Sequence, residues 1–533
     1  MIGYDYNLKL VLSMMRKLQL KDLFVGKTDA KNELIENNMQ NKKLFCDSFL
    51  IPENIDVDDF FYGKRYYITG LKGIGKTALL HYIDLKMSET VNYTSSFVLF
   101  KSSFTSEDKA AFAMTANTFC TIKNAGDDDF DDYVSVWQWF LHRQIVLNAK
   151  QSESPYFEDD INWKKYSSCV LSPKLGNEES GIIRLLPKLK RGNIEIGANI
   201  EYLKGKLGLE FEWENEPAKV VKFSQLVRQA NELYTKLKPA KVRFYLYIDE
   251  LELSLTKQKQ YEKDIRLIRD LIVSINHMNT ISRQNNYNIH IISAIRSEVL
   301  TAINATGKEI NKPILDFGVN LKWQQSGGNI DNHPLIKIIN KKIRATENYY
   351  QLPVSSDEEI WKKYFPEKIN NQPIKDYILH RTWYRPRDIV RLLNIAIQQF
   401  PNETKFSHQV FDAIKKEYST QSWIEHAEEL GAIYSVDEID GIKKMLTALK
   451  CPFTFHQISE KCDRTREMYS SLDNLLKKHK MGDLLCHLYN IGIIGNTGEK
   501  IRYSFRGDDE LVIENQMKIH DPLWNYLSIE YRK

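Results

Sequence analysis

The segment RYYITGLKGIGKTALL, residues 65–80, is the part of the chain that best predicts the fold. The apolar and aromatic run 65–69 predicts a short buried strand, and the apolar residues after Thr77 predict the start of a helix. Between them, residues 70–77 match G-x-x-x-x-G-K-[ST], the pattern of a loop that binds nucleotide phosphates. An ordinary glycine loop is the alternative, but the position between a strand and a helix favours a phosphate loop.

The residue types in this loop fit the chemistry of phosphate binding. Its glycines let the backbone turn tightly enough to point successive N–H groups at a polyphosphate: Gly70, Gly73 and Gly75. The helix that opens at Ala78 adds the positive end of its dipole, so Ala78 belongs to the expected nucleotide-binding set. We expect Lys76 to reach the β- and γ-phosphates and the Thr77 hydroxyl to bind Mg²⁺.

A second motif follows another predicted buried strand. Residues 243–248 (RFYLYI) are succeeded by Asp249 and Glu250. An aspartate at the carboxyl end of a core strand can hold Mg²⁺ through water, and the adjacent glutamate can orient and deprotonate an attacking water. Combined with the loop, the acidic pair predicts nucleotide hydrolysis and not binding alone.

An arginine follows a third predicted strand. Residues 289–294 form a buried apolar run, and Arg296 comes directly after it. Ligands bind at the carboxyl edge of parallel sheets, so Arg296 is a candidate sensor of the γ-phosphate. An ion pair between Arg296 and a nearby carboxylate such as Glu298 is the alternative.

A further pair of arginines lies in residues 383–388, WYRPRD. Pro386 suits the first position of a helix, which would put Arg385 and Arg387 at the start of that helix, within reach of a bound nucleotide. With Glu250 and Lys76, we expect Arg296 and Arg387 to contribute to catalysis.

The composition indicates a soluble protein of several domains. The chain has 533 residues, of which 42% are hydrophobic and 27% charged. Its 74 basic and 70 acidic residues give a net charge of +4, too balanced to identify a nucleic-acid binder. Residues 1–20 lack the apolar core of a signal peptide and no apolar run is long enough for a membrane span, so we expect a cytoplasmic protein without membrane contact. Six cysteines without a CxxC pair indicate neither a zinc module nor a disulfide scaffold.

We expect an α/β fold with four parts. Residues 1–64 form a lead-in that packs on the core, and residues 65–325 form a P-loop NTPase core with a parallel sheet. A helical and β-hairpin insertion at 105–240 interrupts that core. Residues 326–430 form a helical lid, and residues 431–533 a winged-helix-like domain.

Two features of the insertion and one of the last part leave alternatives open. Alternating residues at 187–215 predict β-hairpins, and the acidic run 127–132 is a solvated loop or a Mg²⁺ site. In the last part, short helices between 442 and 491 precede predicted strands at 493–495 and 501–505. The basic cluster 477–480 could contact nucleic-acid phosphates, although many winged helices bind only protein.

Four segments taken in order carry a resemblance to a known group: GLKGIGKT, YLYIDELEL, IISAIRSEVL and WYRPRDIVRLLN. They resemble a bacterial P-loop ATPase of the AAA+/STAND-like (ASCE) group, most of all a family catalogued simply as "P-loop ATPase". The upstream segments VGKTDAKNE and DSFLIPE and the downstream segments LLCHLYNIGIIGNTG and HDPLWNYLSI extend the likeness. It covers most of the chain except 105–240.

The resemblance implies roles for the candidate residues. Lys76 and Thr77 would be Walker A residues, and Asp249 and Glu250 the Walker B pair. Arg296 would be a first-sensor residue, although many AAA+ proteins have a neutral polar residue there. Arg387 would be the second sensor, touching phosphate. ATP is preferred to GTP by the same likeness.

The resemblance also implies a function. Such proteins often occur in bacterial conflict systems, including anti-phage defence, as signal-dependent switches that act as homo-oligomers or with a separate effector protein. We therefore expect an ATPase switch whose helical lid closes on ATP through Arg387. A duplex-stimulated ATPase and a non-hydrolysing scaffold are the alternatives. The Asp249–Glu250 pair argues against the scaffold, and the balanced charge argues against the duplex-stimulated enzyme.

Overall fold

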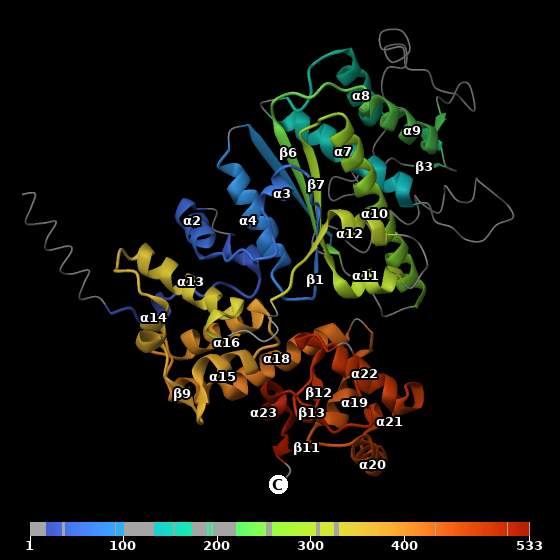
Figure 1. The fold of residues 1–533 in the computed structure, drawn as a ribbon. Coiled ribbons are helices and arrows are strands. Elements are labelled where there is room, and N and C mark those ends of the chain that lie inside the picture. The colour runs from blue at the N-terminus through green and yellow to red at the C-terminus, as the bar shows by residue number, and fades with distance from the viewer. Residues whose placement is uncertain are drawn as a thin grey trace, which may run out of the picture. The chain divides into compact units, whose positions relative to one another are not determined.

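The computed structural model describes residues 17–34, 38–90, 92–100, 133–152, 155–172, 189–190, 193–195, 220–251, 258–304, 310–323, 330–431, 433–508 and 510–531 (Figure 1). The chain divides into two compact units. The first, here called the sheet unit, comprises Asn54–Leu71 and Ile83–Leu321. The second, here called the helical unit, comprises Met1–Glu53, Lys72–Tyr82 and Lys322–Lys533. The predicted phosphate loop begins in the sheet unit and continues in the helical unit.

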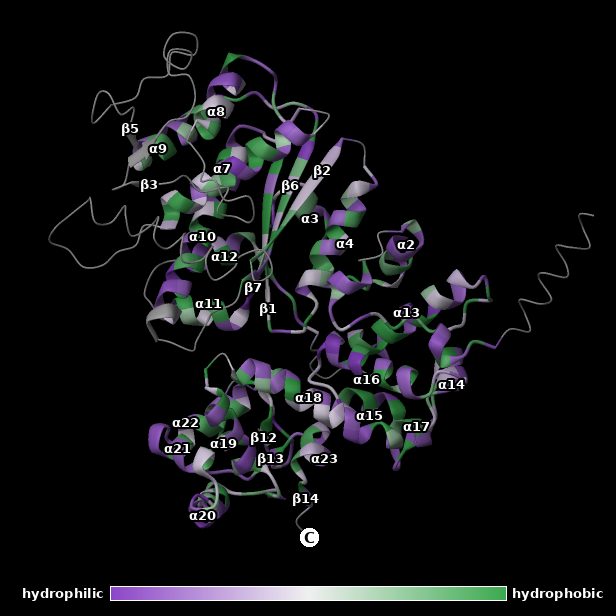
Figure 2. Cartoon of the chain, turned by 180° about the vertical axis from the view of Figure 1, so that it is seen from behind, coloured by the Kyte–Doolittle hydropathy of each residue, from purple (hydrophilic) through white to green (hydrophobic). Residues whose placement is uncertain are grey.

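A five-stranded parallel sheet forms the centre of the sheet unit. Its order is β2 (Tyr93–Leu99), β6 (Arg243–Leu251), β7 (Ile289–Arg296), β1 (Tyr67–Gly70) and β8 (Gly318–Asn320). The predicted α/β class and the predicted core strands are confirmed. Figure 2 shows β6 as a hydrophobic strand and β2, at the edge, as more polar. Strands with helices on both faces are apolar throughout, which explains why β6 and β7 have the continuous apolar sequences from which they were predicted.

Helix α10 (Gln258–Gln284) lies against the middle of this sheet. The Tyr67 hydroxyl of β1 donates to the Ile272 carbonyl at 2.7 Å. The Asn279 side chain forms two hydrogen bonds with the backbone of Ile291 in β7, at 2.8 and 3.0 Å. These contacts hold the strands whose ends carry the candidate residues.

The described residues of the insertion form helices and one small sheet. Helix α7 (Tyr133–Gln151) contains Trp137, whose indole N–H donates to the Leu267 carbonyl of α10 at 2.8 Å. Further helices in the described residues of the sheet unit are α3 (Asp58–Phe61), α8 (Ile161–Leu171), α9 (Phe223–Tyr234), α11 (Ser297–Asn304) and α12 (Asn311–Phe317). Helix α4 (Lys76–Ser88) begins in the helical unit and ends in the sheet unit.

A small antiparallel sheet confirms part of the hairpin prediction. Strand β3 (Leu189–Lys190) pairs with β4 (Asn193–Glu195), which also pairs with β5 (Val220–Lys222). The remaining predicted hairpins and the acidic run 127–132 lie outside the described residues.

The helical unit contains the segment predicted as helical at 326–430. Its helices there are α13 (Pro334–Tyr349), α14 (Asp357–Tyr364), α15 (Ile374–His380), α16 (Pro386–Gln399), α17 (His408–Ala413) and α18 (Lys415–Leu430), with the short strands β9 (Lys368–Ile369) and β10 (Gln372–Pro373) between α14 and α15. The N-terminal residues up to Glu53, including α2 (Met39–Ser48) and short 3-10 turns at Leu20–Asp22 and Ala30–Glu33, belong to this unit.

Residues 374–400 form two helices, α15 and α16, with a break at 381–385. Pro386 is the first residue of α16, as predicted, and its ring keeps Arg385 extended at φ −116° and ψ 132°. A continuous helix is excluded because the residue before proline disfavours the helical conformation.

The last part of the helical unit packs around its own apolar core. Its helices are α19 (Val436–Leu446), α20 (Phe455–Thr465), α21 (Ser470–Lys478), α22 (Met481–Asn490) and α23 (Trp524–Leu527). Two strand pairs join them: β12 (Ile494–Asn496) with β13 (Met517–Ile519), and β11 (Lys450–Cys451) with β14 (Glu530–Tyr531). Among the described residues, no helix is sufficiently long and apolar for a membrane span.

The prediction of a strand at 501–505 is wrong. The partner of β12 is β13, and Arg502 makes only an isolated bridge with Asn496. Tyr503 and Phe505 are both buried in the apolar core, and a 3-10 turn begins at Ser504. The alternation of residues that suggested a strand therefore comes from side-chain packing.

Candidate functional site

The loop after β1 has the backbone conformation that its glycines permit. Gly73 and Gly75 have φ angles of +76° and +102°. Residues with a Cβ atom rarely adopt this region, so the glycines are required by the path of the chain. Helix α4 begins directly afterwards at Lys76, followed by Thr77 and Ala78.

Two carbonyl groups of the loop accept hydrogen bonds from other residues of the same unit, the helical unit. The backbone N–H of Arg387 donates to the Gly73 carbonyl at 3.4 Å, and the indole N–H of Trp323 donates to the Ile74 carbonyl at 2.7 Å. In a trans peptide the next N–H points away from the carbonyl, so the N–H groups of Ile74 and Gly75 are directed to the opposite side. This orientation fits a loop that presents N–H groups to an anion.

The start of α4 carries the residues expected to hold phosphate and metal. Lys76 is 9% exposed, and the first-turn N–H groups of a helix favour anions. Among the described residues, no group of three or more His, Cys, Asp or Glu side chains could hold a metal ion. Mg²⁺ in nucleotide sites needs no such protein cage, because phosphates and water supply most of its ligands. Thr77 and Asp249 have side-chain oxygen atoms, the ligand type that Mg²⁺ prefers.

Four candidate residues lie at or near one edge of the sheet in the sheet unit. Gly70, the last residue of β1, is opposite Arg296, the last residue of β7, in the register of the two strands. Strand β6, which ends beyond Asp249 and Glu250, is the other neighbour of β7. The carboxyl ends of these parallel strands are the edge at which such sheets bind ligands.

The Asp249–Glu250 pair has an unusual backbone. Asp249 is 5% exposed, and Glu250 has a φ of +63°. The Glu250 N–H donates to Oδ1 of Asp249 at 2.7 Å, and the β6–β7 register shifts between Ile248 and Leu251. A left-handed glutamate is strained by about 1 kcal/mol or more, and such strain collects at functional sites. The irregularity turns the Glu250 side chain out of the regular alternation of β6.

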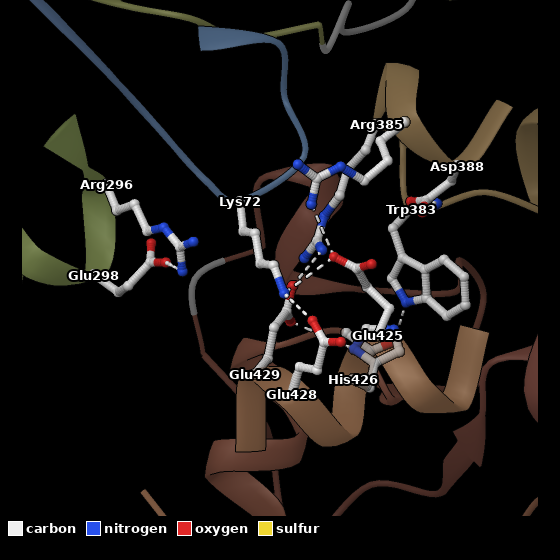
Figure 3. Close-up of polar contacts among 12 residues, drawn as sticks. Lys72, Arg296, Glu298, Trp383, Arg385, Asp388, Glu425, His426, Glu428 and Glu429 are labelled. Atoms are coloured by element: carbon white, nitrogen blue, oxygen red, sulfur yellow. Dashed lines mark hydrogen bonds and ion pairs between the residues drawn. The ribbon is translucent and has the colours of Figure 1, made fainter. Parts of the chain in front are cut away.

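Arg296 lies near Glu298 in the sheet unit. The Nη1 atom of Arg296 is 3.8 Å from Oε1 of Glu298, and both side chains are drawn in Figure 3. The distance is near the upper limit for an ion pair, and both groups are partly exposed, so the pair is weak. The ion-pair alternative is thus present in the structure, and the sensor role of Arg296 stays a prediction.

Arg385 and Arg387 are held by glutamates of α18 in the helical unit. Arg385 Nη1 lies 2.8 Å from Oε1 of Glu429, and Arg387 Nη1 lies 2.9 Å from Oε1 of Glu425. Arg387 also donates through Nε to the Thr28 carbonyl at 3.0 Å. The guanidinium groups that were expected to face phosphate are therefore paired with carboxylates.

The predicted phosphate loop contributes a further cation to these ion pairs. Lys72 Nζ lies 3.1 Å from Oε1 of Glu425 and 3.4 Å from Oε2 of Glu428. Figure 3 draws these side chains together. Arg391 Nη2 lies 3.1 Å from Oε2 of Glu425. One carboxylate, Glu425, thus receives three cations from two segments of the helical unit that are distant in sequence. We call these residues the α18 ion cluster: Lys72, Arg385, Arg387, Arg391, Glu425, Glu428 and Glu429.

The carboxylates of the α18 ion cluster are stabilised in their charged form. Burial by itself would raise the pKa of Glu425, but Lys72, Arg387 and Arg391 outweigh it and lower the pKa to about 2. Burial also opposes ionisation of Glu429, and Arg385 and His426 hold its pKa well below the usual range. Both groups therefore remain charged at neutral pH.

Sequence reasoning missed Lys72 and the glutamates. A signal was present, because Glu425, Glu428 and Glu429 have the spacing i, i+3, i+4, which puts them on one face of a helix. Nothing in that spacing indicated which cations they meet.

Trp383, two residues before Arg385, connects the segment of Arg385 and Arg387 to the apolar core of the last part of the chain. Trp383 is 1% exposed, and its indole N–H donates to the Gly492 carbonyl at 2.8 Å. Its ring packs between His426 and His520, with both centroid distances 4.6 Å. A displacement of the 383–387 segment would therefore disturb that core.

The basic cluster 477–480 is largely paired with acids. Lys477 lies 2.6 Å from Asp473, and Lys478 and His479 each lie 3.2 Å from Glu438. This neutralisation reduces the positive charge that the cluster offers to nucleic acid.

One family model matches the chain. Residues 333–425 match a model described as "FunZ-associated C-terminal helical domain". The match begins beside α13 and ends within α18, at Glu425, and it includes Arg385, Arg387 and Arg391. No curated protein matches the chain.

Proposed function

We propose that this protein is an ATPase of the P-loop kind that acts as a nucleotide-dependent switch. The observation that carries the proposal is the loop after β1, where Gly73 and Gly75 are left-handed and the carbonyls of Gly73 and Ile74 accept protein donors. This conformation directs N–H groups to one side, as phosphate binding requires.

The strand order supports hydrolysis in addition to binding. Strand β7 lies between β1 and β6, so Arg296 is flanked by the start of the loop and by the strand that carries Asp249 and Glu250. In the proposed reaction Lys76 neutralises the phosphates, and Thr77 and Asp249 hold Mg²⁺, which offsets the developing charge. Glu250 orients the attacking water and accepts its proton.

The switch function rests on the helical unit. The side chains of Arg385 and Arg387 lie beside Gly73 of the loop. Trp383, in the same segment, lies in the apolar core of the last part of the chain. A phosphate-dependent rearrangement of the arginines would thus disturb that core, and a partner or a second copy would recognise the altered state. The family likeness adds a role in bacterial anti-phage defence with a separate effector as part of this proposal.

The second candidate function is an ATPase stimulated by duplex DNA, in which residues 431–533 would be a winged helix. The helices α19 to α22 followed by the β12–β13 pair favour it. The pairing of Lys477, Lys478 and His479 with acids weighs against it.

The test is phosphate release by the purified protein with ATP and Mg²⁺, in the presence and absence of duplex DNA. We expect slow release that Lys76→Ala abolishes together with ATP binding, and that DNA does not change. Unchanged ATP affinity in Lys76→Ala would overturn the site assignment. Strong stimulation by DNA would establish the second candidate instead.

A further inference from the structure

We propose that Glu425 competes with the phosphates of the nucleotide for Lys72 and Arg387, so that Lys72 becomes an additional phosphate ligand when Glu425 releases it. The inference rests on the proposed function and assigns a role to the α18 ion cluster. In the absence of nucleotide, α18 would thus hold the loop lysine and the lid arginine in an inactive arrangement.

The first argument is the position of Lys72. It is adjacent in sequence to Gly73, at the loop where phosphates would bind, yet its Nζ atom contacts Glu425 and Glu428. A lysine side chain is long and flexible, and its ammonium group can exchange one anion for another.

The second argument is the closeness of the loop to the arginines. A Cβ atom placed on Gly73 would lie 3.4 Å from Cβ of Arg387 and 3.5 Å from Cδ of Arg385. The side chains of both arginines thus lie in van der Waals range of the loop, and the guanidinium of Arg387 is paired with Glu425.

The third argument is the balance of charge. Lys72, Arg387 and Arg391 surround Glu425, while Glu428 and Asp388 provide additional carboxylates for Lys72 and Arg391. A triphosphate would add several negative charges to an arrangement in which the cations already have partners. Glu425 and the phosphates cannot share the same cations without repulsion, so one of them must give way.

Helix α18 gives this exchange a route to the rest of the unit. Trp423, two residues before Glu425, stacks on Tyr526 with a centroid distance of 5.8 Å. Leu430, at the end of α18, lies in the apolar core of the last part of the chain. Release of Glu425 would therefore loosen α18 at its contacts with that core.

The experiment measures the dissociation constant of ATP with Mg²⁺ for the full chain and four variants. Glu425→Gln keeps the size of the side chain and removes its charge, so we expect ATP to bind on the order of tenfold tighter. Lys72→Gln is expected to weaken binding by a similar factor. Glu417→Gln, also on α18 but paired with Gln421 Nε2 at 2.7 Å, is the matched control and should not change the affinity.

The fourth variant, Lys76→Ala, separates the two proposals. If Lys76→Ala binds ATP normally, the proposed function fails, whatever Glu425 does. If Lys76→Ala loses binding but Glu425→Gln binds ATP no more tightly than the parent, the competition is overturned and the function stands. A purely structural Glu425 would give weaker binding in Glu425→Gln.

A second measurement applies even if Glu425→Gln does not fold. Hydrogen exchange of residues 415–430 in the unaltered chain should become faster when ATP and Mg²⁺ are added, because Glu425 loses Lys72 and Arg387. Lys76→Ala should show no such change. Unaltered or slower exchange in α18 on ATP binding would overturn the proposal.

Discussion

The backbone N–H of Glu250 donates to the carboxylate of Asp249 at 2.7 Å, while Glu250 itself has a left-handed φ of +63°. The two adjacent acids thus have different surroundings: Asp249 is buried and accepts a hydrogen bond, and Glu250 is partly exposed at a backbone irregularity. This division fits one carboxylate that holds a cation and one that acts on water.

Two variants of Glu250 separate its chemical role from its backbone strain. Glu250→Gln should bind ATP as the parent does but hydrolyse it about 10²-fold or more slowly, because a positioned base is lost. Glu250→Gly should be equally inactive yet more stable by roughly 1 kcal/mol, because glycine adopts a positive φ without strain. Phosphate release and urea unfolding measure the two effects. Full activity in either variant would show that the base is elsewhere.

Trp323 should support the phosphate loop through one hydrogen bond. Trp323→Phe removes the donor to the Ile74 carbonyl and keeps most of the ring, so the loss is about 1 kcal/mol. We expect about fivefold weaker ATP binding, measured by titration. Trp361→Phe, which removes a 2.8 Å hydrogen bond to Asn340 in the same unit, is the control and should leave ATP affinity unchanged. Equal affinity in both variants would exclude a supporting role for Trp323.

The depressed pKa of Glu425 predicts a dependence of stability on acid. Its folded-state pKa is about 2, below the ordinary value of 4.5, so its charge stabilises the fold above pH about 4.5 and this contribution is lost as the pH falls toward about 2. The groups that face it are Lys72, Arg387 and Arg391.

Denaturant unfolding at several pH values between 2 and 5 tests this linkage. As the pH falls, the free energy of unfolding should decrease less steeply for Glu425→Gln than for the parent chain. The two slopes should differ by the binding of at most one proton, or about 1.4 kcal/mol per pH unit. Glu417→Gln, in which the altered carboxylate is partly buried and accepts a hydrogen bond from Gln421, should follow the parent. Identical slopes for Glu425→Gln and the parent would show that the ion pairs do not stabilise the fold.

The basic cluster should be structural and not a nucleic-acid contact. Glu438 accepts from Lys478 and His479 and also caps α19 through Ser435, and these contacts lower its pKa to about 2 although burial opposes them. Lys477→Gln combined with Lys478→Gln should therefore leave any weak affinity for duplex DNA almost unchanged at physiological salt. A filter-binding titration measures it, and a loss of tenfold or more would restore the cluster as a DNA contact.

Much of the sheet unit could be predicted because its signals are local. The apolar runs before Gly70, Asp249 and Arg296 gave three strands of the observed sheet, since parallel strands with two covered faces are apolar along their length. The proline of the 383–388 segment correctly predicted the start of α16. The strand at 501–505 failed because the same alternation arises when Tyr503 and Phe505 pack into a core without pairing.

The amino-acid order by itself determined the loop glycines, the position of Lys76 and Thr77 at the start of a helix, and the acidic pair after a core strand, because each depends on neighbours a few residues apart. Tertiary structure alone decided the left-handed backbone of Glu250 and the partners of Arg385, Arg387 and Lys72. Lys72 and Glu428 are 356 positions apart. A helical pattern shows which residues share a face, but only the packing of distant segments determines what that face meets.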